Sequence, residues 1–220
     1  MIKVRRFDEC TGIYVEQIKG HSRYGYAIRR DGIDMYDMPN ILEERDYQGQ
    51  EIFFFDYETM QRYQPFQREV NVLYESPVYK DGAFCFLQAD FNKKIITLFE
   101  YTLGEKPKAV TMLNTDEVNL YNLRIRGEGV YITSSDDEFV CYYPEKFSFK
   151  LEKNEGVEFM DEGKVYLSAW IEEGWDDEYN IPSDAYKYYD KVVVRDYQGN
   201  LISEEVGSLH QREDGSWWIS

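Results

Sequence analysis

Cysteine, proline and histidine are scarce in this chain of 220 residues, which has 3 Cys, 6 Pro and 2 His. The cysteines (Cys10, Cys85 and Cys141) are odd in number, far apart and without a CxxC pair, so we expect neither a disulfide framework nor a zinc site. Cys85 and Cys141 lie in the apolar runs AFCFL and FVCYY, where we interpret them as small buried hydrophobic residues. This use of cysteine favours the reducing cytoplasm as the location of the protein.

Long apolar runs are also missing. No stretch approaches the ~18 apolar residues of a transmembrane helix, and the N-terminal segment MIKVRRFDECTG lacks the apolar run of a signal peptide, so we expect neither. Basic residues are outnumbered, because 25 Lys and Arg stand against 42 Asp and Glu, a formal net charge of −17. Since this charge repels phosphate backbones and anionic lipid, we expect no nucleic-acid partner and no membrane partner.

Aromatic residues, by contrast, are abundant, with 20 Tyr, 13 Phe and 4 Trp. Disordered acidic chains are poor in aromatic residues, so the sequence indicates a folded protein despite its charge. A chain of this length can bury a sizeable core without metal ions or crosslinks. We therefore predict a single domain over residues 1–220, monomeric, with no cofactor and no metal.

Clean helical periodicity is absent as well. Alternating or aromatic-rich runs such as EIFFFDY, AFCFLQA and KVVVRDY recur between turns rich in Gly, Asn and Asp, which is typical of strands. The nearest approach to a helical pattern, at residues 34–46, predicts no more than one or two helical turns. The sequence therefore predicts an all-β protein.

A degenerate repeat runs through these strands. A glycine, usually with an acid beside it, introduces an apolar strand five times, at Gly25, Gly82, Gly129, Gly163 and Gly215. Glycine reaches the positive φ angle that a tight reversal needs, and a neighbouring acid can accept backbone N–H groups. The last unit is cut short by the end of the chain, while residues 1–19 read like the second half of another unit, so the two fragments complete one another.

These repeats resemble the blades of a β-propeller. Dividing 220 residues by five units gives 44 residues a unit, within the range of about 40–50 for propeller blades. The resemblance implies a five-bladed β-propeller closed by N- and C-terminal strands, with residues 2–6 pairing with residues 215–220. The motifs of the named propeller families are absent, and a β-sandwich or an irregular barrel is the alternative fold. The blades are predicted near residues 20–75, 76–122, 123–157 and 158–207, with the fifth made of 208–220 plus 1–19.

Basic residues collect before four of the five repeat glycines. In a propeller these stretches would connect the blades and surround the mouth of the central channel, where arginine offers bidentate geometry to a carboxylate or phosphate. We expect them to bind a small anionic ligand. Replacing Arg126 and Arg212 together with alanine should remove the effect of the anion at little cost in stability, as surface substitutions usually do. The alternative is scattered surface charge that neutralises neighbouring carboxylates. The predicted ligand-binding residues are His21, Arg23, Lys80, Arg124, Arg126, His210 and Arg212.

Two acidic, tyrosine-rich insertions lengthen the first and fourth units, at residues 30–50 and 172–190. Long loops in compact domains are usually functional or disordered, and large rigid aromatic residues are favoured in interface cores. The alternative is that both loops fold back and bury their own aromatic side chains. The predicted partner-binding residues are Tyr36, Trp175, Tyr179, Tyr186 and Tyr188.

Catalytic motifs are absent: the chain has no GxSxG, no HExxH and no metal-binding Cys/His spacing, and no catalytic residue is assigned. The sequence favours a non-enzymatic binding or protein-interaction module, which neutralises a basic partner or binds a small anionic ligand. The alternative is a carbohydrate-active hydrolase that uses channel carboxylates, although hairpin turns also require acids at these positions. The candidate carboxylates are Asp31, Asp90, Asp136 and Glu172.

Overall fold

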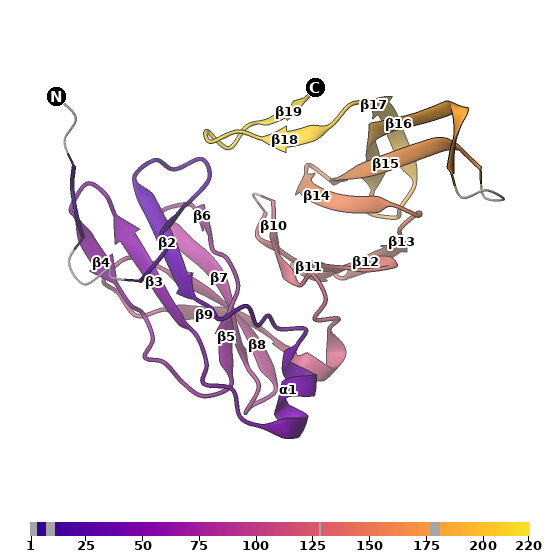
Figure 1. The fold of residues 1–220 in the computed structure, drawn as a ribbon. Coiled ribbons are helices and arrows are strands. Elements are labelled where there is room, and N and C mark those ends of the chain that lie inside the picture. The colour runs from indigo at the N-terminus through magenta and orange to yellow at the C-terminus, as the bar shows by residue number, and fades with distance from the viewer. Residues whose placement is uncertain (1–3, 8–11, 128, 177–180) are drawn as a thin grey trace. The chain divides into compact units, whose positions relative to one another are not determined.

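The structure, a computed structural model, describes residues 4–7, 12–127, 129–176 and 181–220. In this part of the chain almost all regular structure is β-strand, and the strands pair in antiparallel sheets (Figure 1). The helices among the described residues are too short to cross a membrane. The prediction of an all-β protein is confirmed.

Residues 1–125 together with 213–215 form the first of two compact units. Its first sheet has the order β1 (Glu16–Gln17), β2 (Tyr24–Arg29), β3 (Glu51–Asp56) and β4 (Gln61–Tyr63). Its second sheet contains β5 (Val72–Tyr74), β6 (Val78–Lys80), β7 (Ala83–Asp90), β8 (Ile95–Tyr101) and β9 (Lys108–Asn114). Because β5 and β6 pair with different halves of β7, they form one edge strand that is interrupted near Pro77.

Aromatic residues form the core of the first unit. The Phe54 ring on β3 lies 4.6 Å from the Phe84 ring and 5.5 Å from the Phe86 ring, both on β7. All three side chains are fully buried, and Ile52 and Tyr74 join them in the same cluster. Aromatic packing therefore joins the two sheets of this unit, which accounts for much of the high phenylalanine content.

Residues 126–212 together with 216–220 form the second unit. One sheet has the order β10 (Arg124–Arg126), β11 (Tyr131–Ser135), β12 (Glu138–Tyr143) and β13 (Phe147–Lys150). The boundary between the two units falls within β10, before Arg126. The next has the order β14 (Glu155–Asp161), β15 (Lys164–Asp176), β16 (Ile181–Asp196) and β17 (Leu201–Val206). Their shared core includes Phe139, Cys141, Met160, Leu167 and Val193.

The last hairpin, β18 (Leu209–Gln211) and β19 (Trp217–Ile219), completes the second unit. Trp217 stacks on Phe159 of β14 with ring centroids 4.4 Å apart, and Phe159 stacks on Tyr166 of β15 at 4.2 Å. Ser208 and Ser220 exchange backbone hydrogen bonds at the open end of the hairpin. The hairpin is thus held to the β14–β17 sheet by a stack of three rings.

The described strands confirm about five small antiparallel sheets, most of them four-stranded. Among the described residues β19 pairs with β18, residues 4–7 form no strand, and residues 1–3 lie outside the described residues. The propeller arrangement and its closure by the chain ends therefore stay predictions.

Four of the five repeat glycines lie in turns that lead into an apolar strand, as the sequence predicts, but the segments before them differ from the expectation. Gly82, Gly129, Gly163 and Gly215 lie in the turns between the first two strands of a sheet, and Gly25 lies within β2. The segments before them are consequently strands such as β6, β10 and β18, not connections between sheets. The expectation of inter-blade connectors at these places is wrong, because an acid-Gly pair serves a tight hairpin as well as a crossover.

The two insertions fold differently. The first contains the helix α1 (Met38–Glu44), which confirms the short helical segment, and it buries Met35, Met38 and Tyr47 while Tyr36 stays exposed. The second is not a loop, because its residues continue β15 and β16 as paired strands. Trp and Tyr favour strands, and this propensity outweighs the acidic composition that suggested a loop.

Cys85 and Cys141 are buried, and burial raises the pKa of each thiol to about 11. Both thiols stay protonated near neutral pH, so they behave as small hydrophobic side chains, as the sequence indicated. Cys10 lies outside the described residues.

Candidate functional site

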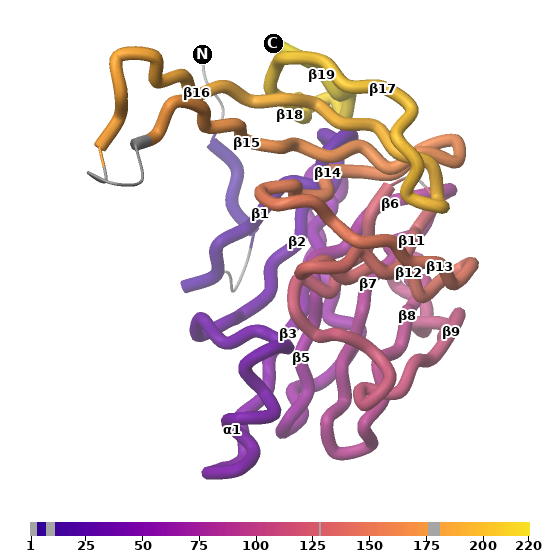
Figure 2. The backbone as a smooth tube through the Cα atoms, turned by 90° about the vertical axis from the view of Figure 1, so that its right-hand side faces the viewer, coloured from indigo at the N-terminus to yellow at the C-terminus, as the bar shows by residue number. Residues whose placement is uncertain are grey.

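The distal half of the β15–β16 hairpin extends past the sheet to which it belongs. β14 pairs with β15 only as far as Ala169, and β17 pairs with β16 only from Lys191 onward. Residues 170–176 and 181–190 therefore form a two-stranded arm, the aromatic ribbon, which both views of the backbone show reaching away from its own sheet (Figures 1 and 2). Isolated two-stranded ribbons are marginally stable in water, so this arm depends on the four-stranded part of its sheet for support.

One face of the aromatic ribbon carries a row of exposed rings. Trp170 lies 6.0 Å from Tyr188, and Trp175 lies 6.0 Å from Tyr186, measured between ring centroids. Trp175 is 40% exposed and Tyr188 is 59% exposed. The alternative, in which this insertion buries its own aromatic residues, does not hold for Trp175, Tyr186 and Tyr188, because all three are exposed.

Cross-strand hydrogen bonds fix the two faces of the ribbon. The Tyr186 hydroxyl donates to Glu172 (2.7 Å) on the aromatic face, and the Tyr189 hydroxyl donates to Glu173 (2.9 Å). Ile171 packs against the core of the second unit, so the row of rings lies on the face turned away from that core. Accepting carboxylates raise the pKa of both tyrosines, which keeps these hydroxyl groups protonated as donors.

The other predicted partner-binding residues divide as follows. Tyr36 is exposed and lies in the first unit, where its ring contacts the edge of Tyr121 at 5.2 Å. Tyr179 lies outside the described residues. Trp170 belongs to the ribbon but was not among the predicted partner-binding residues, because it precedes the insertion predicted at residues 172–190. The strand pattern continues through Trp170 into the insertion, and this continuation was the signal that could have identified Trp170.

The first unit contains His21, Arg23, Lys80 and Arg124. His21 and Arg23 lie on the two sides of one aromatic pair: the His21 ring is 4.6 Å from Tyr79, and the Arg23 guanidinium is 5.1 Å from the Tyr24 ring. Lys80 follows Tyr79 at the end of β6, and Arg124 donates to the Asn122 side chain (3.1 Å).

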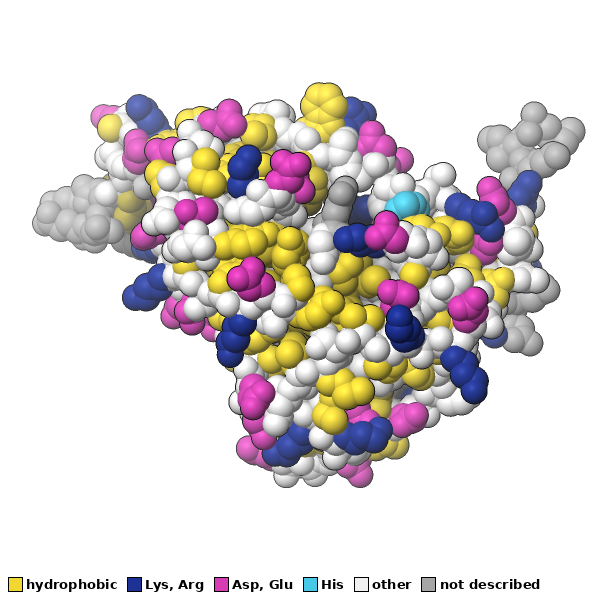
Figure 3. All heavy atoms as spheres, turned by 180° about the vertical axis from the view of Figure 1, so that it is seen from behind, with side chains coloured by type: hydrophobic (Ala, Val, Ile, Leu, Met, Phe, Trp, Pro, Cys, Tyr) yellow, Lys and Arg dark blue, Asp and Glu magenta, His cyan; other side chains and the backbone are white. Residues whose placement is uncertain are grey.

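The second unit contains Arg126, His210 and Arg212. Arg126 is buried and donates hydrogen bonds to the carbonyl oxygens of Val157 and Glu158, so the expectation that its removal costs little is wrong. His210 is exposed on β18, and the Arg212 guanidinium lies 5.5 Å from the Trp218 ring. On the face drawn in Figure 3, basic side chains are scattered among acidic and apolar ones.

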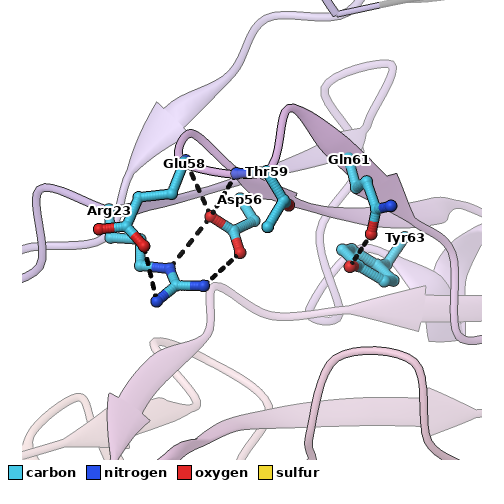
Figure 4. Close-up of polar contacts among 6 residues, drawn as sticks. All are labelled: Arg23, Asp56, Glu58, Thr59, Gln61 and Tyr63. Carbon is cyan, nitrogen blue, oxygen red and sulfur yellow. Dashed lines mark hydrogen bonds and ion pairs between the residues drawn. The ribbon is translucent and has the colours of Figure 1, made fainter.

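Arg23 is anchored by a buried carboxylate (Figure 4). Its Nε and Nη2 groups donate to the two oxygens of Asp56 at 3.1 and 2.7 Å. Asp56 ends β3, its side chain is only 4% exposed, and it also accepts the amides of Glu58 and Thr59. The sequence reasoning missed Asp56, whose only signal was an acid placed between the apolar strand EIFFFD and the turn after it.

The acid at position 56 is expected to stabilise the protein in a pH-dependent way. The Arg23 hydrogen bonds, followed by those of the two amides, lower the pKa of Asp56 despite its burial. A carboxylate with a lowered pKa stabilises the fold above its unfolded pKa of about 3.9 and loses this contribution as pH falls through the folded pKa. Asp56→Asn should therefore cost about 2 kcal/mol at neutral pH, and less below a pH of about 4. Urea denaturation of both proteins at several pH values measures the difference, and a gap independent of pH would contradict this expectation.

The carboxylates considered for hydrolysis take part in local contacts. Asp31 accepts the Tyr47 hydroxyl (2.8 Å), Asp90 accepts the amides of Asn92 and Lys93, and Glu172 accepts Tyr186 in the ribbon. The Asp136 amide donates to the Glu138 carbonyl oxygen (3.2 Å) in a hairpin turn. Asp90 and Asp136 lie at hairpin turns, Glu172 in a strand pair and Asp31 in a contact within the first insertion, and these contacts give no support to the hydrolase alternative.

Among the described residues, no group of three or more His, Cys, Asp or Glu side chains is placed to hold a metal ion. The aromatic ribbon and the surroundings of Arg23 are thus the two candidate sites.

Comparison of the chain with protein-family models, with curated protein sequences and with solved structures gave no significant match.

Proposed function

We propose that the protein is a non-enzymatic binding module that holds a basic protein partner against its aromatic ribbon. The observation that carries this proposal is the one-sided row of exposed rings on an arm that extends beyond its sheet. Trp and Tyr are the residues that most often dominate binding energy when a partner covers them. Binding would also supply the contacts that the free two-stranded arm lacks.

Charge indicates the chemistry of the partner. Residues 170–190 contain seven acids and one lysine, a local charge of 1 − 7 = −6 within a chain of net charge −17. An Arg-rich or Lys-rich surface would be attracted at long range, and its cations could lie on the Trp and Tyr faces at short range. An acidic or neutral partner would receive neither contribution.

The arrangement of the sheets relative to one another is a second part of this proposal. We infer that the successive sheets are the blades of a five-bladed propeller closed by both chain ends. Its support is that the sheets follow one another along the chain as antiparallel meanders, as propeller blades do, with four or five strands in every sheet but the two-stranded last one. Small-angle X-ray scattering tests the arrangement, since a closed ring and an elongated pair of lobes give different distance distributions.

Removing two rings from the ribbon should abolish partner binding without unfolding the protein. Trp175→Ser combined with Tyr188→Ser changes exposed side chains, so we expect the free energy of unfolding to change by only about 0.5 kcal/mol for each. Affinity for the partner should fall about 1000-fold, because two hot-spot residues of about 2 kcal/mol each are lost. The measurement is quantitative crosslinking and capture from a native lysate, followed by titration with the purified partner.

Tyr14→Ser is the matched control, because it removes an exposed ring from the first unit. It should leave binding unchanged, and the interaction of the unaltered protein should weaken steeply as salt is added. Equal binding by the ribbon variant and the control, or capture of an acidic partner only, would overturn the proposal.

A further inference from the structure

A second candidate site, independent of the ribbon, is a recess of about 240 Å³ in the first unit. We call it the Arg23 recess, because the guanidinium of Arg23 forms part of its wall. Its volume is below the roughly 300 Å³ of the smallest drug-sized pockets, so an occupant must be small.

One edge of the guanidinium is fixed by the protein itself. Asp56 engages Nε and Nη2 in a bidentate pair, and two backbone amides hold Asp56 in turn. The position of Arg23 is therefore set before any ligand arrives, which lowers the entropy cost of binding.

The other edge of the guanidinium is held by a replaceable group. Its Nη1 atom lies 2.8 Å from a carboxylate oxygen of Glu58, whose side chain is 66% exposed. Exposed ion pairs contribute little to stability, so a carboxylate arriving from solution can displace Glu58 at small cost. The Glu58 carboxylate shows how such a group would lie against this edge.

Aromatic rings form the neighbouring wall. Tyr24, Tyr79 and Phe84 contact one another with centroids 4.8 to 5.3 Å apart. Burial raises the pKa of Tyr79 to about 12, so its hydroxyl stays neutral. A ligand with a flat apolar body would pack on the partly exposed rings of Tyr24 and Tyr79 while its carboxylate meets Arg23.

We infer that the Arg23 recess binds a small monocarboxylic acid with an aromatic or apolar body, in competition with Glu58. A planar carboxylate matches a single guanidinium edge. A phosphate carries more charge than this edge can neutralise beside Asp56 and Glu58, in a protein of net charge −17.

The test uses the full chain and three ligands: phenylacetate, acetate and inorganic phosphate. Calorimetric titration should detect phenylacetate more strongly than acetate, and phosphate most weakly. Glu58→Gln should strengthen phenylacetate binding about three- to fivefold, since it removes the competing carboxylate of an exposed pair. Glu44→Gln is the matched control, because it removes one exposed negative charge from the end of α1, away from the recess.

Arg23→Lys is the second variant, because it keeps a cation beside Asp56 but lacks the two-edged geometry. It should abolish phenylacetate binding while circular dichroism shows a folded protein. Equal effects of Glu58→Gln and Glu44→Gln, binding that survives Arg23→Lys, tighter binding of phosphate than of phenylacetate, or no measurable binding of phenylacetate to the Glu58→Gln protein would each overturn the inference.

Discussion

Replacing Gly49 with alanine is expected to destabilise the first unit by at least about 3 kcal/mol. Gly49 has a φ angle of +79°, and a Cβ atom added there would lie 1.8 Å from the backbone carbonyl oxygen of Glu69. The obstacle is backbone, so no side chain can rotate away. Adjacent backbone hydrogen bonds, Gln50 N–H to Val72 and Asn71 N–H to Tyr47, would have to break for the segments to separate.

Gly32→Ala is the control for this effect. Gly32 has a φ angle of +89°, but nothing lies within 4 Å of an added Cβ atom. Its replacement should cost only the strain of a left-handed backbone, about 1–2 kcal/mol. Urea denaturation of both variants separates the free-energy cost of backbone strain from the cost of the steric overlap. Equal losses of stability would show that residues 49 and 69 do not approach each other as the structure places them.

Ending the chain at Gly215 is expected to have an effect of similar size on the second unit. Loss of residues 216–220 removes β19, leaves β18 without its strand partner and uncovers the Phe159 ring. Loss of a packed Trp and of several hydrogen bonds should together cost at least about 4 kcal/mol. Thermal denaturation should show a large fall in the melting temperature of this unit.

Two single substitutions divide this effect between the two tryptophans of β19. Trp217→Ala removes the ring stacked on Phe159 and should account for about 2–3 kcal/mol. Trp218→Ala removes a ring that is half-exposed and lies near Arg212, so it should cost under about 1 kcal/mol. If the truncated protein melted at the same temperature as the full chain, the packing of the last hairpin on its sheet would be refuted.

Strand composition made the fold class predictable. The runs around Phe54, Phe86 and Val193 alternate or are wholly apolar, and these strands are central in their sheets. β3 and β7 bury most of their side chains, and β16 buries the valines around Val193. Local turn chemistry also marked the hairpins correctly. It could not say which strands a glycine turn joins, because Gly82 or Gly163 adopts the same backbone whether the chain returns within a sheet or leaves it.

The candidate sites were less accessible from the sequence. Composition identified the insertion containing Trp175, Tyr186 and Tyr188, but acidic residues suggested a loop where cross-strand pairing extends two strands. Arg126 and Arg23 looked alike as basic residues near a repeat glycine. Their environments differ because one lies among buried backbone carbonyls and the other faces Asp56, which is 33 residues away along the chain. Contacts at such separations leave no local pattern.

The division into two units, each with its own core, has a spectroscopic consequence. All four tryptophans of the chain, Trp170, Trp175, Trp217 and Trp218, belong to the second unit, and the first unit has tyrosine and phenylalanine only. Selectively excited indole emission therefore reports on the second core alone, whereas far-ultraviolet circular dichroism reports on both. A protein damaged at Gly49 could lose half of its sheet signal while its indole emission stays native, so agreement between the two signals is a direct measure of whether the two cores melt together.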